Sequence, residues 1–187
     1  MHRYERAVAS IIVLATVAMG SVAQTNAVYS SQSLTEDQLS VYRGFLEKFD
    51  ALHIKNLSKI TLPLDFNGFP EGRPCLSGIE LDSSLDALKS AHAFGPEIAK
   101  GRDLNLVDPV EQTKLLEERA KQSQPTENDL NFLIFSEIAF DKTHHYAVLK
   151  YLLICGKHCD SGATLVMEKI DGHWTTSSRR PCAMFLN

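Results

Sequence analysis

Two closely spaced cysteines carry the clearest chemical potential in this chain. Cys155 and Cys159 flank the residues Gly156-Lys157-His158. A thiol pair of this kind can form a structural disulfide, exchange with other thiols, or ligate a metal together with an imidazole such as that of His158. Three intervening residues, where a redox motif has two, argue against thiol exchange. We therefore expect a disulfide, with a redox pair and a metal site as the alternatives.

Histidines form a second group of candidate functional residues. Three imidazoles that lie close together can hold zinc and leave one coordination position open for hydrolytic chemistry. His144, His145 and His173 are expected at one end of a sheet. His158 is expected at the other end, about 30 Å away across a strand of about ten residues. Solvated turn histidines are the competing interpretation, and no catalytic or metal-ligating residue is assigned.

Familiar catalytic motifs are absent from the sequence. The chain has no His-Glu-x-x-His motif, no Gly-x-Ser-x-Gly motif and no glycine-rich phosphate loop. It also lacks a basic stripe with interleaved aromatic residues, which excludes a nucleic-acid footprint. No cofactor is predicted. Trp174 is interpreted as a core anchor, and the Arg179-Arg180 pair as a solvated strand end.

The first 23 residues have the pattern of a secretory signal. Arg3 and Arg6 precede an apolar core from Ala7 to Met19, and Ser21-Val22-Ala23 predicts cleavage between Ala23 and Gln24. The alternative is an uncleaved anchor, because Ala7 to Ala23 contains no charge. Cleavage would change the formal net charge from -4 to -5, since two arginines and Glu5 are removed. After cleavage we expect a secreted or periplasmic protein with no membrane segment.

The remainder is interpreted as a flexible leader, residues 24–33, and one α+β domain, residues 34–187. Thr35 and Gln38 form a capping box that predicts an amphipathic helix from Thr35 to about Phe49. Further helices are predicted for Leu81–Phe94 and Pro109–Lys121, and an extended segment for His53–Leu62. The helices are expected to pack on a carboxy-terminal antiparallel meander of about four strands.

The predicted meander begins near Phe132. Its strands are expected at Phe132–Phe140, Tyr146–Cys155, Gly162–Ile170 and His173–Ser178. Asp171-Gly172 is a hairpin signal, because both positions of a type I′ turn need positive φ. Apolar residues on both faces of the second run predict a central strand that is covered on both sides.

Strand topology also favours one of the three possible disulfide pairings. The turns of a meander alternate between its ends, which places Cys155, Cys159 and Cys182 together. Facing positions beside a short turn lie within the distance that a disulfide accepts. We therefore expect Cys155 to pair with Cys159 and Cys75 with Cys182. Chain entropy predicts about 2 kcal/mol for the small ring and about 4.7 kcal/mol for the large one.

The carboxy-terminal half resembles a group of uncharacterised exported bacterial proteins. The similar segments are Phe135 to Asp141, Tyr146 to Leu149, Cys155-Gly156 to Cys159, and Met167 to Trp174. They correspond to a Ser-x-x-x-Phe strand, a Cys-Gly-x-x-Cys turn and a strand ending in Glu-Lys-x-x-Gly-x-Trp. The chain departs from the group at Asp160, where glycine is usual, and in its ending with the added Cys182. The resemblance implies export and a meander, and no activity.

Two functional hypotheses follow from these patterns. The first is a non-catalytic exported module that binds a protein or a cell-envelope component, or serves structurally. The second is a small secreted hydrolase, either metal-dependent or histidine-based, with its site at His144, His145 and His173. Stoichiometric zinc would distinguish the second from the first.

Overall fold

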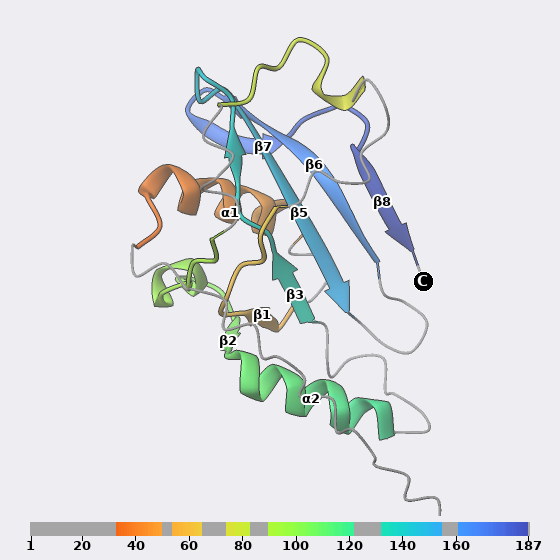
Figure 1. Ribbon diagram of the computed structural model, residues 1–187. Helices are drawn as coiled ribbons and strands as arrows, with labels where there is room; N and C mark the ends of the chain where they lie inside the picture. The colour runs from red at the N-terminus through yellow and green to blue at the C-terminus, as the bar shows by residue number, and fades with distance from the viewer. Residues whose placement is uncertain are drawn as a thin grey trace, which may run out of the picture.

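The computed structural model describes residues 33–49, 54–64, 74–82, 90–121, 132–154 and 161–186 (Figure 1). Several of the sequence predictions lie outside these residues. They are the signal peptide with its Ala23–Gln24 cleavage site, the leader up to residue 32, His158, and the pair Cys155 and Cys159. Among the described residues, no helix has the length and apolar character needed to span a membrane.

Two α-helices have well-defined starts. In α1, Glu36–Lys48, the Thr35 hydroxyl accepts a hydrogen bond from the Gln38 backbone N–H, and the Gln38 side chain accepts one from the Thr35 N–H at 2.8 Å. In α2, Pro109–Lys121, one carboxylate oxygen of Asp108 accepts from the N–H groups of Val110 and Glu111, both at 2.9 Å. Both arrangements satisfy backbone donors that have no partner within the helix. Two short 3₁₀ helices, η2 (Pro74–Leu76) and η4 (Pro96–Ala99), complete the helical elements that the described residues form.

One mixed sheet contains all eight strands of the described chain. The strands are β1 Asn56–Ser58, β2 Asn105–Val107, β3 Phe132–Phe135, β4 Ala139–Phe140, β5 Tyr146–Ile154, β6 Ser161–Ile170, β7 His173–Thr176 and β8 Ala183–Leu186. The main path runs β2-β1-β3-β5-β6-β7, while β4 pairs with β5 and β8 with β6. The β1 strand is parallel to both β2 and β3, and the remaining pairings are antiparallel. The α+β class agrees with the sequence prediction, whereas the sheet is mixed and larger than the four-stranded antiparallel one expected.

Three other expectations need correction. The predicted helix Leu81–Phe94 is not helical at its described ends, where Leu81 bridges to Asp141 and Ala93 bridges to Ile60. Residues 83–89 between these ends lie outside the described chain. The predicted strand Phe132–Phe140 is two strands, β3 and β4, separated by three residues. The last strand was expected at His173–Ser178, but Ala183–Leu186 forms a further strand, β8, which pairs with β6.

The interruption between β3 and β4 is a β-bulge. Phe135 pairs with Tyr151, and Ala139 pairs with Val148. Four residues on one strand therefore match three on its partner, so one extra residue is accommodated. Bulges of this kind redirect side chains and are common beside functional sites. Here the bulge contains Ser136 and Glu137.

The central strand β5 is covered on both faces. Its Ala147 and Leu149 pack in the main core with α1, whereas Val148 packs in a second cluster with Cys75 and Cys182. A third cluster joins β2 and β3 to Leu115 of α2. Figure 1 shows α2 at the opposite end of the molecule from Pro74–Leu76. Asp171 and Gly172, with φ of 50° and 80°, form the positive-φ turn between β6 and β7 that the sequence predicted.

Candidate functional sites

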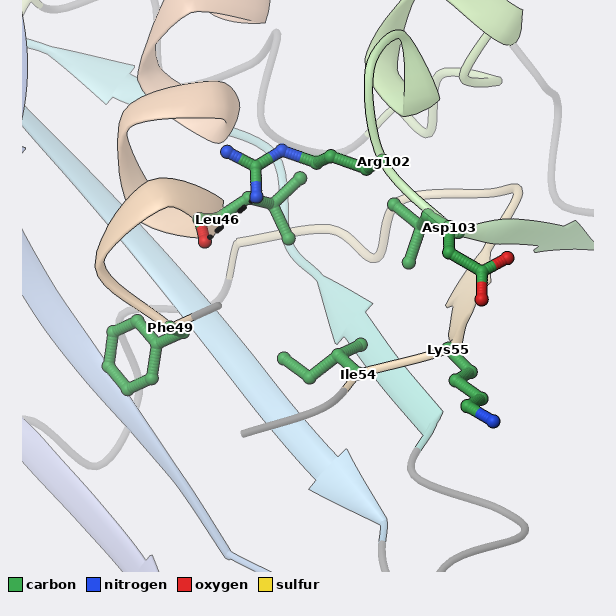
Figure 2. Close-up of a pocket in the computed structure, with 7 residues that line it drawn as sticks. Leu46, Phe49, Ile54, Lys55, Arg102 and Asp103 are labelled. Carbon is green, nitrogen blue, oxygen red and sulfur yellow. Dashed lines mark hydrogen bonds between the residues drawn. The ribbon is translucent and has the colours of Figure 1, made fainter. Parts of the chain in front are cut away.

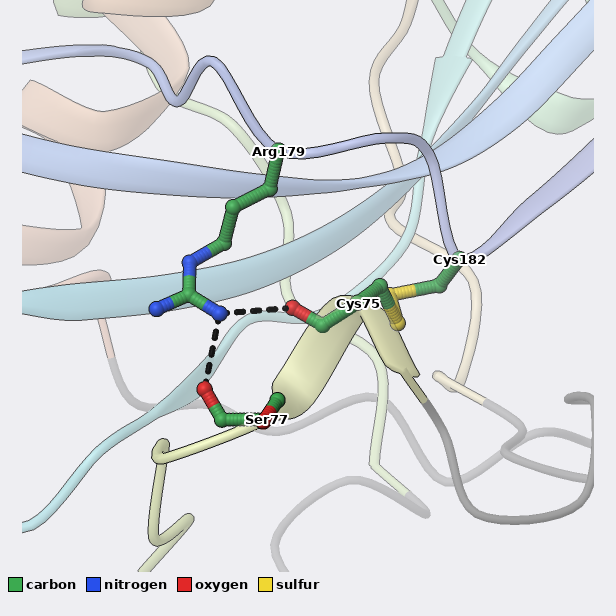
Figure 3. Close-up of a disulfide and its surroundings, with 4 residues drawn as sticks. All are labelled: Cys75, Ser77, Arg179 and Cys182. Carbon is green, nitrogen blue, oxygen red and sulfur yellow. Dashed lines mark hydrogen bonds between the residues drawn. A yellow bond between two sulfur atoms is a disulfide. The ribbon is translucent and has the colours of Figure 1, made fainter.

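The Cys75 and Cys182 sulfurs form a disulfide with an S–S distance of 1.99 Å (Figure 3). Both cysteines are buried. Arg179 lies beside the bond and donates to the carbonyl oxygens of Ser77 at 2.8 Å and Cys75 at 3.4 Å. Arg179 is thus a tether between the terminal segment and η2, not the solvated strand end that the sequence suggested. The predicted Cys155–Cys159 bond stays a prediction.

The turn histidines make separate contacts with different carboxylates. His144 Nδ1 lies 2.8 Å from Asp37 Oδ2, while His145 Nε2 lies 3.6 Å from Glu168 Oε1. His173 is exposed at the start of β7. Within the described ranges, no three histidine, cysteine, aspartate or glutamate side chains are grouped so that they could hold a metal ion. His144, His145 and His173 are therefore not grouped as a metal site, while a histidine-based site that uses them without a metal stays a hypothesis.

Asp37 joins α1 to the sheet through three hydrogen bonds. Its Oδ1 accepts from Lys169 Nζ at 2.9 Å and from Trp174 Nε1 at 3.1 Å, and its Oδ2 faces His144. Burial by itself raises the pKa of Asp37, but the hydrogen bonds from these three side chains outweigh it. The pKa therefore lies below its ordinary value of 3.8. Trp174 is only 4% exposed, which agrees with its interpretation as a core anchor.

A buried carboxylate organises a second polar cluster, which sequence reasoning did not identify. Glu137 Oε1 accepts hydrogen bonds from the Thr61 hydroxyl and, at 2.9 Å, from the His92 backbone N–H. Glu137 Oε2 lies 2.9 Å from His92 Nδ1. The side chain of Glu137 is 3% exposed and that of His92 is 12% exposed. We call Thr61, His92 and Glu137 the Glu137 cluster.

The β-bulge explains why Glu137 points into the protein. The Ser136 hydroxyl, instead of a backbone carbonyl, accepts from the Lys150 N–H at 2.8 Å. The carbonyl thereby released accepts from the Tyr42 hydroxyl at 2.8 Å, and Glu137 N–H donates to the Leu62 carbonyl at 2.7 Å. The bulge therefore attaches the strand to α1 and to the 60–62 segment. Burial, together with the nearby charge of Glu137, raises the pKa of Tyr42 well above 10.0.

Local sequence patterns do not show that these groups meet. Thr61 and Glu137 are 76 positions apart, and His92 and Glu137 are 45 apart. The one available signal was a glutamate in the apolar run from Phe132 to Phe140, where a charge is unexpected unless it has buried partners.

A pocket lies at the carboxy-terminal end of α1 (Figure 2). Its volume is about 290 Å³. Its apolar lining is Leu46, Phe49, Ile54 and Leu104, and its polar lining is Lys55, Arg102 and Asp103. In Figure 2 the Arg102 side chain reaches across toward α1, where Nη1 donates to the Leu46 carbonyl at 3.4 Å. The part of the lining that the structure describes thus combines an apolar wall with one acidic and two basic side chains.

No family model, curated protein or solved structure matches the chain. The resemblance to exported bacterial proteins therefore stays an expectation.

Proposed function

We propose that this chain is an exported binding module that takes a small ligand in the pocket at the end of α1. The ligand has an apolar body and an anionic group. The observation that carries the proposal is the pocket itself, in which an apolar wall and two cationic side chains meet in a volume of about 290 Å³. Ligand pockets are concave and mainly apolar, with a few polar groups that orient the ligand, and start at about 300 Å³.

Export is the second part of the proposal. It is supported by the charged start, apolar core and small-residue end of residues 1 to 23. The Cys75–Cys182 disulfide adds support, because such bonds persist mainly in oxidising compartments. The proposed resemblance to exported bacterial proteins points the same way. A small cell-envelope component with an acyl chain is a ligand that an exported protein would meet.

The lining residues determine the ligand class. Leu46, Ile54 and Leu104 offer hydrocarbon surface that releases water when an apolar ligand binds. Among the described residues of the lining, the cationic Lys55 and Arg102 outnumber the acidic Asp103. An anionic group is therefore favoured over a cationic one.

Octanoate is a suitable probe, because it combines a carboxylate with a short hydrocarbon chain. We expect saturable chemical-shift changes at the pocket residues on titration with octanoate, and none with acetate. Lys55→Glu should weaken octanoate binding by about five- to tenfold, because an exposed attraction is replaced by repulsion.

The matched control is Lys114→Glu, which makes the same charge change on an exposed side chain of α2. It should leave the octanoate affinity unchanged. If both variants weakened octanoate binding equally, the effect would come from the net charge of the protein and not from the pocket. Chemical-shift changes confined to other parts of the protein would overturn the pocket assignment.

A further inference from the structure

The Glu137 cluster places a histidine in an orientation that suits proton transfer. The carboxylate of Glu137 faces Nδ1 of His92 at 2.9 Å. Because Glu137 accepts this hydrogen bond, the proton of the neutral imidazole is held on Nδ1, and Nε2 keeps its lone pair. None of the described residues hydrogen-bonds Nε2 of His92.

The cluster is also rigid. Thr61 Oγ1 accepts from the His92 N–H at 2.8 Å, and the Thr61 N–H donates to the His92 carbonyl at 3.0 Å. The bridges Ile60 to Ala93 and Leu62 to Ser136 hold the same segments on either side. Side chain and backbone of His92 are therefore both fixed, while 12% of the side chain still reaches solvent.

Packing alone does not call for this arrangement. A buried carboxylate is costly unless it is hydrogen-bonded, and an apolar residue would fill the site at lower cost. Here one oxygen of Glu137 accepts hydrogen bonds from the Thr61 hydroxyl and the His92 backbone N–H, and its other oxygen faces the imidazole ring of His92. A carboxylate that orients Nδ1 and leaves Nε2 available is the arrangement by which hydrolytic enzymes prepare a general base.

We propose that His92 is the general base of a hydrolytic site for small neutral esters, with Glu137 and Thr61 as positioning residues. Nε2 takes a proton from water while the water oxygen bonds to the ester carbonyl carbon and the carbonyl π electrons move to its oxygen. When the tetrahedral intermediate collapses, the bond to the alcohol oxygen breaks and the imidazolium returns the proton to that oxygen. Acid and alcohol leave, and the neutral ring is restored.

The charges in and around the Glu137 cluster favour a neutral substrate over an anionic one. The Glu137 carboxylate is the charged group of the cluster, and the side chains that hydrogen-bond to it are those of Thr61 and His92. No lysine or arginine among the described residues hydrogen-bonds to the cluster. A phosphate ester would need such a cation to stabilise its transition state, whereas a neutral ester does not.

The test compares two histidines that each face a carboxylate. The substrate is p-nitrophenyl acetate, and the variants of the full exported chain are His92→Asn and His144→Asn. We expect His92→Asn to lower the hydrolysis rate by about tenfold or more, while His144→Asn stays at the wild-type rate. Equal rates in all three proteins, or an equal fall in both variants, would show unspecific imidazole catalysis and overturn the proposal.

A second measurement does not depend on folding of a variant. Long-range ¹H–¹⁵N spectra of the wild-type protein report the tautomer of each histidine. We expect the neutral ring of His92 to carry its proton on Nδ1, where Glu137 accepts it. A neutral ring with its proton on Nε2 would contradict the assignment.

Discussion

Asp37 links three segments through a single carboxylate. It stands in the first turn of α1 and accepts hydrogen bonds from Lys169 and Trp174 on the β6–β7 hairpin, while facing His144 in the turn before β5. An acidic residue at a helix start also interacts favourably with the helix dipole. These contacts explain why the helix is fixed at one end of the sheet.

Replacing this carboxylate tests its contribution. Asp37→Asn should lower the free energy of unfolding by about 1–3 kcal/mol, because hydrogen bonds to a charged group are lost. Chemical denaturation provides the measurement. The control Glu36→Gln removes a neighbouring acid whose side chain is 80% exposed, and it should change stability by less than about 0.5 kcal/mol. Similar losses in both variants would contradict the assigned role of Asp37.

The dependence of stability on acid pH is expected to come from the carboxylates of Asp37 and Asp141. Burial opposes ionisation of Asp141, but hydrogen bonds from Thr143, Tyr146 and His145 hold its pKa below 3.8. A lowered folded-state pKa stabilises the protein above the unfolded pKa, and this contribution is lost as the pH falls through the folded pKa. Unfolding free energy should thus be level near pH 6 and fall below about pH 4. Asp37→Asn should make that fall shallower, and an unchanged slope in the variant would contradict the account.

At the scale of elements, α1 crosses β7 at a glycine. A Cβ atom built on Gly44 would lie 2.2 Å from the Trp174 backbone oxygen. In an open helix, alanine is favoured over glycine by about 1 kcal/mol. Here the backbone of β7 cannot move without shifting Trp174. The cost of the steric overlap is therefore expected to exceed the gain in helix propensity.

Gly44→Ala is therefore expected to destabilise the protein by about 1–3 kcal/mol. Glu47→Ala, on an exposed position of the same helix, should be neutral within about 0.5 kcal/mol. Thermal unfolding of the two variants provides the comparison. A stabilised Gly44→Ala protein would show that α1 does not approach β7 this closely.

Sequence patterns anticipate local features better than distant ones. The capping contacts of Thr35 and Gln38, and the turn at Asp171 and Gly172, involve residues at most three positions apart, so their signals are visible in the chain itself. The parallel strands β1 and β2 are each three residues long. β1 lies within the extended segment predicted for His53–Leu62, whereas no strand was predicted at β2. Their pairing depends on segments about 50 residues apart. The Glu137 cluster was missed for the same reason.

At the scale of the molecule, the sheet is covered on two faces, and a disulfide holds the strand at one of its edges in place. The Cys75–Cys182 bond joins η2 to the residue before β8 across 107 positions. Cys182 N–H also donates to the Thr164 carbonyl at 2.8 Å, which places the crosslink directly on β6. The bond therefore restricts much of the unfolded chain and secures the last strand.

Removing the crosslink should have a large effect. The double variant Cys75→Ala/Cys182→Ala should lose about 3–5 kcal/mol of unfolding free energy, because the closed loop is long. Non-reducing peptide mapping of the wild-type protein should recover a peptide that joins Cys75 to Cys182. A peptide that joins Cys75 to Cys155 would refute this connectivity.

Binding of octanoate in the pocket at the end of α1 tests the proposed function most directly. Intermolecular nuclear Overhauser effects between octanoate and methyl-labelled protein would identify the contacting side chains. The account predicts contacts from the octanoate chain to the methyl groups of Leu46, Ile54 and Leu104. These contacts should disappear when an excess of an unlabelled ligand of the same class, with an apolar body and an anionic group, competes for the pocket. Saturating octanoate without such contacts, or with contacts confined to the exposed side chains of β8, would contradict it.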